Sequence, residues 1–487
     1  MNQPATKVLV IGYVWPEPRS SAAGGHMMQI LETFLTQGWD ITFASPAALG
    51  EHKADLQVLG IKECAIELNN SSFDDFVREL APDIVLFDRF MMEEQFGWRV
   101  EKCCPDALRV LETSDLQVLG IAECAIELNN SSFDDSIREL APDIVLFDRF
   151  MMEEQFGWRV EKCCPNALRV LESSDLQSLR DARHQRLKDF LKTQPEADDF
   201  SPLFSQDLAA EFTYMADTDL AKREIAAIYR CDISLMISDV EIQLLTEHFK
   251  VPAALLHWCP LMVIPPTEAF APFEDRAHFL SIGNFRHAPN WDAVLWMKNS
   301  VWPLIRKQLP GVQLHVYGAY TPPKATALHN PAQGFHVMNW AEDALQVMTA
   351  ARICLAPLRF GAGIKGKLAD AMLCGTPSVT TPVGAEAMGE PWPGVVEHSA
   401  SALAAQAVAL YQDQERWAQA QEDGRQLLAR RYAQDLHGPA LVARLEQCRS
   451  ELAEHRRNNF TGSMLRHHLH KSTQYMAQWI EAKNRSL

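Results

Sequence analysis

The sequence lacks the features that mark membrane-spanning, disulfide-rich and zinc-binding proteins. No apolar stretch approaches the ~18–20 residues of a membrane-spanning helix. The 11 cysteines include no C-x-x-C pair and no cysteine–histidine ladder with zinc spacing, which favours reduced, mostly buried thiols and predicts no metal site. No signal-type segment accompanies the first short apolar run. We therefore expect a cytoplasmic protein.

Positive charge is also scarce. Lys and Arg total 45 against 63 Asp and Glu, a net charge of −18, which excludes a generally basic nucleic-acid-binding surface. Hydrophobic residues make up 47% and charged residues 22%, as in ordinary globular proteins. A length of 487 residues by itself suggests two or three domains.

Part of that length is a repeat, because residues 55–114 return almost unchanged as residues 115–174. The two copies differ only at the pairs Lys62/Ala122, Phe76/Ser136, Val77/Ile137, Asp106/Asn166 and Thr113/Ser173. There are only two units, and the flanking sequence does not continue the pattern, so this is an in-frame tandem duplication rather than a solenoid. Without one copy, the length fits two domains.

Each copy has the pattern of a strand–helix–strand–helix–strand segment. A parallel sheet has one position for each strand, so two full sets cannot fill the same positions. We expect one copy to complete the sheet and the other to be extruded, added at an edge or partly disordered. The second copy is the better candidate for the last strand, because it runs directly into the following helix, and a hybrid of both copies is an alternative.

Alternation of short apolar runs with amphipathic segments predicts an α/β fold with parallel sheets. The first strand is expected within residues 8–14, followed by a glycine-containing loop and a helix over 26–37. Prolines cluster between residues 260 and 272 and mark a boundary. We predict an N-terminal Rossmann-like domain over 1–265, a C-terminal Rossmann-like domain over 270–440, and a helical tail over 441–487.

The most informative stretch covers residues 356–379. A predicted strand ends in a loop that contains Gly361, Gly363 and Gly366, and a predicted helix follows at once. Glycines let backbone N–H groups approach an anion, and a helix N-terminus adds partial positive charge. The P-loop pattern and the dinucleotide fingerprint are both absent. The loop therefore indicates a different kind of phosphate site.

Charged residues beside this loop complete the pattern. Lys365 and Lys367 would supply full positive charges, and Asp370, one turn into the helix, could accept two hydroxyl groups of a ribose. Together they indicate a nucleoside diphosphate site. A tight strand–helix turn with solvated lysines is the simpler alternative.

The segment resembles the donor site of the retaining family 4 glycosyltransferases, which have the GT-B fold of two Rossmann-like domains facing across a cleft. The matching positions are Lys367, Asp370, Ala371, Met372, Gly375, Pro377, Val379, Gly384 and Glu386. Residues 281–293 resemble the first strand and loop of the family's C-terminal domain. The opening strand with Gly24 and Gly25 resembles the loop that faces the donor.

The resemblance implies which residues contact the donor. By this resemblance, lysine, arginine and a helix N-terminus stabilise the leaving group, without a metal or other cofactor. The candidates for that role are Lys365, Lys367 and Arg286, and the wider donor set is Gly24, Gly25, Gly361, Gly363, Asp370 and Glu386.

Some positions depart from the family pattern. Many relatives carry two glutamates eight residues apart, where this chain has Ala362 and Asp370. After the first strand of the C-terminal domain, relatives usually have Gly-Arg, where this chain has Gly283-Asn284. Arg286 or His287 is then the candidate for a phosphate contact at this position.

In the N-terminal domain, many relatives place a catalytic histidine after the strand predicted at 84–87. Here the position is Asp88-Arg89-Phe90, repeated as Asp148-Arg149-Phe150. Asp148 or Arg149 could orient the acceptor, and a local ion pair or helix cap is the alternative. His26 could reach the donor or be an ordinary helix-start histidine.

The tail carries His467, His468 and His470, which we interpret as a solvated helix face rather than a metal site. We expect residues 472–483, with Tyr475 and Trp479 on one face, to form a C-terminal helix that crosses back onto the N-terminal domain. Contact with an anionic membrane surface is the alternative, through Arg456, Arg457, Arg466 and Lys471.

By resemblance, the activity is sugar transfer with retention from a UDP- or GDP-sugar to a saccharide or lipid-linked acceptor, in cell-surface polysaccharide synthesis. Two other functions stay open. One is a nucleotide-sugar epimerase on the same fold, and the other is an inactive nucleotide-binding or interaction protein.

Overall fold

The computed structural model describes residues 6–16, 22–47, 53–67, 72–88, 90–105, 107–112, 132–204, 208–319 and 321–467. The chain divides into two compact units, Met1–Leu128 and Asn129–Leu487. The stretch 1–265, predicted as one domain, is therefore shared between both units. The predicted α/β class is confirmed, because every strand pairing within the three sheets is parallel and helices connect the strands.

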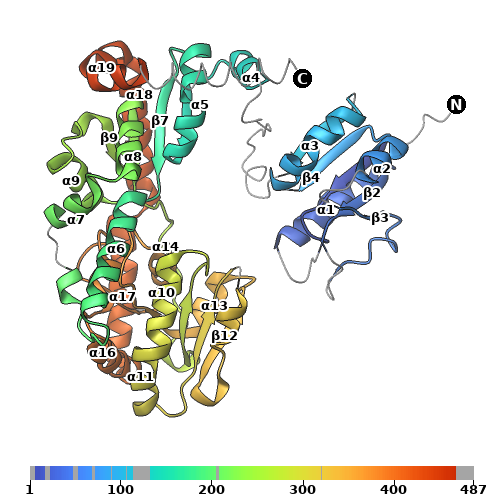
Figure 1. Ribbon diagram of the computed structural model, residues 1–487. Helices are drawn as coiled ribbons and strands as arrows, with labels where there is room; N and C mark the ends of the chain where they lie inside the picture. The colour runs from blue at the N-terminus through green and yellow to red at the C-terminus, as the bar shows by residue number, and fades with distance from the viewer. Residues whose placement is uncertain are drawn as a thin grey trace. The chain divides into compact units, whose positions relative to one another are not determined.

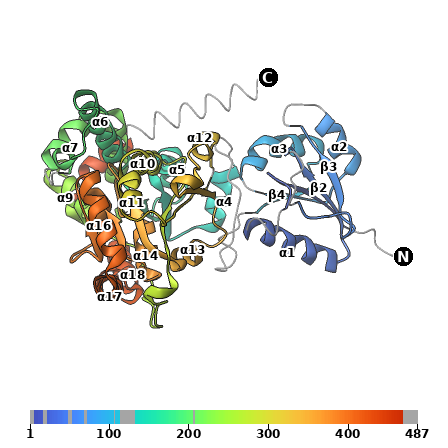
Figure 2. The same ribbon diagram turned by 90° about the horizontal axis from the view of Figure 1, so that it is seen from below.

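The first unit is a five-stranded sheet in the order β3-β2-β1-β4-β5. Its elements are β1 (Lys7–Ile11), α1 (Ala22–Thr36), β2 (Asp40–Ser45), β3 (Lys62–Ala65), α2 (Ser72–Leu80), β4 (Ile84–Asp88), α3 (Phe90–Cys103) and β5 (Leu108–Glu112). Successive side chains of a strand point to opposite faces. Leu9 and Ile11 accordingly pack in a cluster with α2 and α3, and Val8 and Val10 pack with residues of α1. In Figure 2, α1 lies on the opposite face of this sheet from α2 and α3.

The second unit begins with a four-stranded sheet in the order β6-β7-β8-β9. Its elements are α4 (Ser132–Leu140), β6 (Ile144–Asp148), α5 (Arg149–Cys163), β7 (Leu168–Ser173), α6 (Gln177–Thr193), α7 (Leu208–Met215), α8 (Asp219–Arg230), β8 (Ile233–Met236), α9 (Asp239–Glu247) and β9 (Leu256–Trp258).

A six-stranded sheet follows in the order β12-β11-β10-β13-β14-β15, the order of a Rossmann sheet. Its elements are β10 (His278–Ile282), α10 (Ala288–Trp296), α11 (Trp302–Gln308), β11 (Leu314–Tyr317), α12 (Pro323–Thr326), β12 (Phe335–Asn339), α13 (Ala344–Ala350), β13 (Ala351–Ala356), α14 (Gly366–Leu373), β14 (Ser378–Thr380), α15 (Pro382–Ala385), β15 (Gly394–Val396), α16 (Ala400–Gln412) and α17 (Gln414–Arg431). The predicted proline-rich boundary lies between β9 and β10.

The two sequence copies enter different sheets. In the first unit, β3, β4 and β5 of the first copy extend the sheet begun by β1 and β2. In the second unit, β6 and β7 of the second copy pair with each other, and β7 pairs with β8. The hypothesis that one copy completes the sheet while the other is extruded, added at an edge or partly disordered is thus wrong, because the downstream strands give the second copy a sheet of its own. The second copy does not supply the last strand of the first sheet, since its β7 pairs with β8.

The chain returns to the four-stranded sheet through α18 (Gln434–Ser450) and α19 (Leu452–Asn458), which lie beside β7 and β9 in Figure 1. Cys448 is buried with Leu168 and Ile233 of that sheet. Arg456 pairs with Asp232 at 2.7 Å. The predicted crossing helix at 472–483 lies outside the described residues, and α18 and α19 make a crossing of this kind earlier in the chain.

Candidate functional site

The Gly-rich loop lies where the strand order of the six-stranded sheet reverses. The chain passes from β10 to β11 on one side, and β13 pairs with β10 on the other. Ligands of parallel α/β sheets bind outside the carboxyl ends of the strands at such a point. A cavity of 370 Å³ opens there. Its lining residues are Arg149, Ser174, Asp175, Gln177, Arg180, His287, Pro289, Asn290, Leu358, Gly361, Ala362, Ile364, Lys365, Gly366 and Lys367.

Two lysines are among the cationic residues that line this cavity, which we call the lysine cavity. The ammonium of Lys365 donates to the carbonyl oxygen of Gly363 at 2.6 Å, and that of Lys367 donates to Asn290 Oδ1 at 2.6 Å. Burial lowers the pKa of each lysine to about 8. Lys365 is also the N-cap residue of α14, so both charges stand at a helix N-terminus. The cavity is therefore built to attract an anion.

A buried carboxylate holds the loop from the other side. Glu241, on α9, accepts hydrogen bonds from the backbone N–H groups of Gly363 at 2.7 Å and Leu176 at 3.3 Å. Burial raises the pKa of Glu241 to about 8. Within the described residues, its Oε2 has no hydrogen-bond partner. Glu241 thus links α9, the start of α6 and the Gly-rich loop.

An arginine of α6 makes a second link to the loop. Arg183 donates to the carbonyl oxygen of Gly361 at 2.8 Å and to both carboxylate oxygens of Glu386 at 2.7 Å. Although burial opposes ionisation of Glu386, its pKa is held below the usual value by Arg183. The loop is therefore held by side chains from α6 and α9, which come from the first half of the chain.

The structure brings several predicted donor residues together. Gly361, Lys365 and Lys367 line the lysine cavity, and Gly363 belongs to the same loop. Asp370 is half-buried one turn into α14, where burial raises its pKa; it is not among the lining residues. The donor-binding roles of these residues stay predictions.

Glu386 does not present a free carboxylate to the cavity, because both of its oxygens accept from Arg183. Gly24 and Gly25 were expected in a loop, and that expectation is wrong, because they fall within α1 of the first unit. The helix begins four residues earlier than the predicted start at residue 26.

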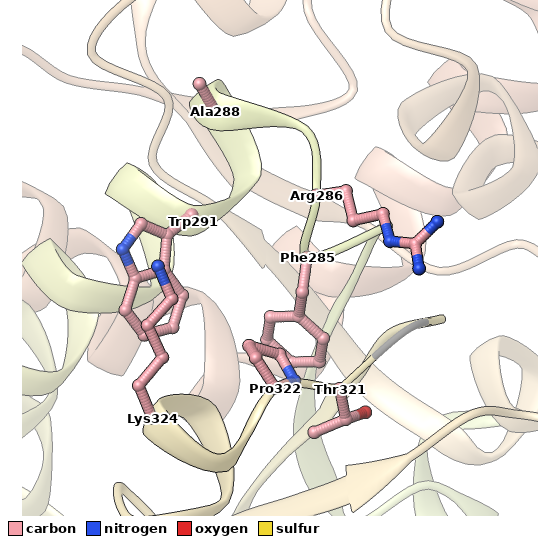
Figure 3. Close-up of a pocket in the computed structure, with 7 residues that line it drawn as sticks. All are labelled: Phe285, Arg286, Ala288, Trp291, Thr321, Pro322 and Lys324. Atoms are coloured by element: carbon pink, nitrogen blue, oxygen red, sulfur yellow. The ribbon is translucent and has the colours of Figure 1, made fainter.

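The residues predicted to act in catalysis do not all line one cavity. Arg149 lines the lysine cavity, and its guanidinium lies 3.5 Å from the carboxylate of Asp148, which is 71% exposed. This is the local ion pair named as the alternative to an acceptor-orienting role. Arg286 lines a different cavity, together with Phe285 and Trp291 (Figure 3). Arg286 is not among the residues that line the lysine cavity, and a donor contact through it stays a prediction.

Sequence reasoning missed the residues that hold the loop. In the sequence, Ser238 and Glu241 have the spacing of a capping box, which by itself gives Glu241 no role in another segment. Ser238 does cap α9, since its hydroxyl accepts from the Glu241 N–H at 3.2 Å, but the glutamate side chain turns to Gly363. Nothing in the local sequence singled out Arg183, whose partner Glu386 is 203 residues away.

Residues 276–413 match the family model described as glycosyl transferases group 1. The matched segment includes Lys365, Lys367 and Glu386, and it covers less than half of the chain. The domain formed by β10 to β15 is thus similar to the group 1 glycosyl transferases. No curated protein sequence matches the chain significantly.

Solved structures share low sequence identity with the chain. A S. aureus TarM mutant in complex with fondaparinux, alpha-GlcNAc-glycerol and UDP is 11% identical with a TM-score of 0.48, over 64% of this chain and 58% of that one. Sucrose-phosphate synthase from Thermosynechococcus elongatus is 14% identical with a TM-score of 0.48, over 91% and 98%. Anabaena HepE in complex with UDP and glucose is 12% identical with a TM-score of 0.44, over 92% and 99%.

Among the described residues, no helix has both the length and the apolar character needed to cross a bilayer. Across the same part of the chain, no group of three or more His, Cys, Asp or Glu side chains is arranged to hold a metal ion.

Proposed function

We propose that this protein is a glycosyltransferase that moves a sugar, with retention of anomeric configuration, from a UDP- or GDP-sugar to a saccharide or lipid-linked acceptor in cell-surface polysaccharide synthesis. The match of residues 276–413 to the group 1 family supports the reaction class. Retention, the acceptor and the pathway come from the sequence resemblance alone.

The observation that carries the proposal is the pair of lysines in the lysine cavity, of which Lys365 is buried and Lys367 is partly buried. In the reaction, the bond from the anomeric carbon to the diphosphate oxygen breaks, and a bond to an acceptor hydroxyl oxygen forms on the same face of the sugar. Negative charge then develops on the leaving diphosphate. We propose that Lys365, Lys367 and the N-terminus of α14 stabilise that charge. We propose that no metal ion is required.

The remaining roles follow the geometry of the cavity. We propose that Arg149, which lines it, orients the acceptor, and that Asp148 positions Arg149 through their ion pair. Asp370, on the first turns of α14, would accept hydroxyl groups of the ribose. We also propose that the protein acts in the cytoplasm. For the alternative of membrane contact, Arg456 and Arg466 already bond within the fold, the latter to the carbonyl oxygen of Arg230.

Nucleotide binding is the first test. Isothermal titration of the full chain with UDP and with GDP should give saturable binding to at least one of them. Lys367→Ala should weaken that binding roughly tenfold to a hundredfold, because a charge-assisted hydrogen bond is removed. Lys307→Ala is the matched control, since Lys307 is exposed on α11, and it should leave binding unchanged. A folded protein that binds neither nucleotide would contradict the proposal.

Transfer is tested with a panel of UDP- and GDP-sugars and mixed saccharide acceptors. The anomeric configuration of the product, read by NMR, should equal that of the donor. Conversion of the donor sugar to its epimer without acceptor would indicate an epimerase instead. Nucleotide binding with no transfer to any acceptor would indicate a non-catalytic nucleotide-binding protein.

A further inference from the structure

Two arginines and two lysines line the lysine cavity, and the two kinds of residue are held by different groups. Both arginines are paired with carboxylates. The guanidinium of Arg149 lies 3.5 Å from the carboxylate of Asp148, and that of Arg180 donates to Asp175, which lines the same cavity. Because each of these pairs is neutral as a whole, the arginines add little net charge for an approaching anion.

The two lysines are held by uncharged oxygens instead. The ammonium of Lys365 donates to the carbonyl oxygens of Gly363 and Ala362, and that of Lys367 donates to the side-chain oxygen of Asn290. Across the part of the chain that the structure describes, neither lysine forms an ion pair with a carboxylate. A carbonyl or amide oxygen accepts a hydrogen bond and carries no net charge. The ammonium groups are therefore oriented without being neutralised.

Asn290 differs from the other acceptors because it holds its lysine through a side chain. It lies in the first turn of α10, 77 residues before Lys367. Its amide nitrogen donates to the carbonyl oxygen of Asn284 at 3.1 Å, in the loop after β10. A carbonyl oxygen can only accept and an ammonium group can only donate, so the two partners fix which end of the amide faces which. Asn290 thus links this loop to the start of α14.

The end of β10 lies directly against this link. A Cβ added at Gly283 would lie 2.6 Å from Asn290 Nδ2 and 2.9 Å from Lys367 Nζ. The backbone of Gly283 therefore packs on both groups, and a side chain at that position would push them apart. Three segments, namely the end of β10, the start of α10 and the start of α14, meet at the hydrogen bond between Asn290 and Lys367.

We propose that Asn290 is a positioning residue of the donor site, whose amide oxygen fixes the ammonium of Lys367 beside the N-terminus of α14 and leaves its charge for the diphosphate. This inference rests on the proposed function, because the diphosphate belongs to the nucleotide sugar of that reaction. The role requires an uncharged acceptor. A carboxylate at this position would hold Lys367 equally well, but it would cancel the charge and repel the diphosphate.

The groups that act on the charge of Lys367 are Lys365 and Cys354 of β13, and Lys367 itself acts on His287 at the start of α10. Burial raises the pKa of Cys354 to about 12 and lowers the pKa of His287 below its usual value. The thiol is therefore protonated and the imidazole uncharged between pH 7 and 9.5. In this range the charge beside Asn290 changes through the lysines, with Glu241 acting on Lys365.

The test compares Asn290→Ala with Asn290→Asp in the full chain, by isothermal titration with UDP, or with GDP if GDP is the nucleotide that binds. At pH 7, Asn290→Ala should weaken binding roughly threefold to tenfold, because Lys367 keeps its charge and loses its acceptor. Asn290→Asp should weaken binding more than tenfold, because the new carboxylate cancels that charge. Asn299→Asp makes the same chemical change at an exposed position in Met297–Val301, which follows α10, and it should leave binding unchanged.

The pH profile separates positioning from a merely structural contact. The carboxylate of Asn290→Asp should raise the pKa of Lys367 by at least about one unit, since an opposite charge at this distance favours the protonated form. The alkaline loss of nucleotide binding then moves to higher pH, and the difference from the unsubstituted chain narrows between pH 7 and 9.5. NMR titration of the Lys367 side chain without nucleotide measures the pKa directly, with its signal assigned by its loss in Lys367→Ala.

Each variant can overturn the inference by itself. Nucleotide affinity in Asn290→Ala equal to that of the unsubstituted chain would do so, and so would an unchanged pKa of Lys367 in Asn290→Asp. Parallel losses of thermal stability and affinity in both variants, with the pH profile unmoved, would show a merely structural contact. Failure of the unsubstituted chain to bind UDP and GDP would instead refute the proposed function, so the two failures are distinguishable.

Discussion

The carboxylate of Glu241 accepts a hydrogen bond from the backbone N–H of Gly363, 122 residues further along the chain, at 2.7 Å. This contact holds the Gly-rich loop that carries Lys365. Glu241→Ala should destabilise the protein by about 1–3 kcal/mol and weaken UDP binding, because the buried N–H of Gly363 loses its acceptor. Glu241→Gln keeps an acceptor and should restore both properties. Chemical denaturation and UDP titration measure them, and equal behaviour of the two variants would contradict the positioning role.

The same residue should make stability depend on pH. Burial raises the pKa of Glu241 from 4.5 to about 8 in the folded chain. Between these values the unfolded chain loses the proton while the folded chain keeps it, so stability is full below pH 4.5 and falls as pH rises toward 8. The decline is at most about 1.4 kcal/mol per pH unit. Glu241→Gln lacks this decline, and denaturation at pH 5, 6.5 and 8 should show its advantage growing; a constant difference would contradict the prediction.

Nucleotide binding should weaken in alkaline solution. The pKa values of Lys365 and Lys367 are both lowered to about 8 by burial, so both ammonium groups lose their protons as pH rises through 8. Ionisation of Glu241 in the same range adds negative charge near the loop. UDP affinity should be steady near pH 7 and fall by up to about tenfold per pH unit for each lysine involved. Titration from pH 7 to 9.5 measures it, and a flat profile would exclude a role for the lysine charges.

Two glycines of one loop should respond differently to an added methyl group. Gly363 has φ of +63°, and a Cβ there would lie 2.7 Å from the carbonyl oxygen of Ser174. Gly363→Ala should destabilise the chain by roughly 1–3 kcal/mol and weaken UDP binding. Gly366 has no atom within 4 Å of the same methyl group, so Gly366→Ala should change stability by less than about 1 kcal/mol. Equal effects in thermal denaturation would show that the loop is not tightly held.

The duplication provides matched pairs of identical residues. Leu86 of β4 is 4% exposed, whereas its counterpart Leu146 of β6 is 55% exposed. Leu86→Ala should therefore destabilise its unit by roughly 2–5 kcal/mol and Leu146→Ala by less than about 1 kcal/mol. In the next strand of each copy the difference is larger and in favour of the second copy: Leu108 of β5 is 60% exposed, whereas its counterpart Leu168 of β7 is fully buried.

Hydrogen exchange can follow these variants separately, since peptides starting at Phe76 or Ser136 distinguish the copies. Leu86→Ala should increase exchange in the first copy, and Leu168→Ala should increase it in the second. Equal responses from both members of a pair would contradict the observed burial.

Features that depend on neighbours in sequence could be predicted. Ser238 and Thr218 both cap helices, the latter accepting from the Ala221 N–H at 3.1 Å, and such caps can be read from the sequence because a cap joins residues within one turn. Four strands of the six-stranded sheet (β10, β11, β13 and β14) and the Gly-rich loop before α14 also follow from apolar runs and glycine spacing, whereas β12 and β15 were not predicted. Lys365 and Lys367 reach the cavity because they flank the start of that helix.

The sequence by itself determined the α/β class, the repeat, and the lysines at the helix start, because these depend on short-range periodicity and spacing. Only the tertiary structure decided that Glu241 and Arg183 hold the loop and that Arg286 belongs to a separate cavity. It also gave identical strands such as β4 and β6 different burial. The physical reason is that the burial and hydrogen bonding of a side chain depend on which strands and helices, distant in sequence, pack against it. The nearly identical sequences of the two copies do not specify which elements those will be.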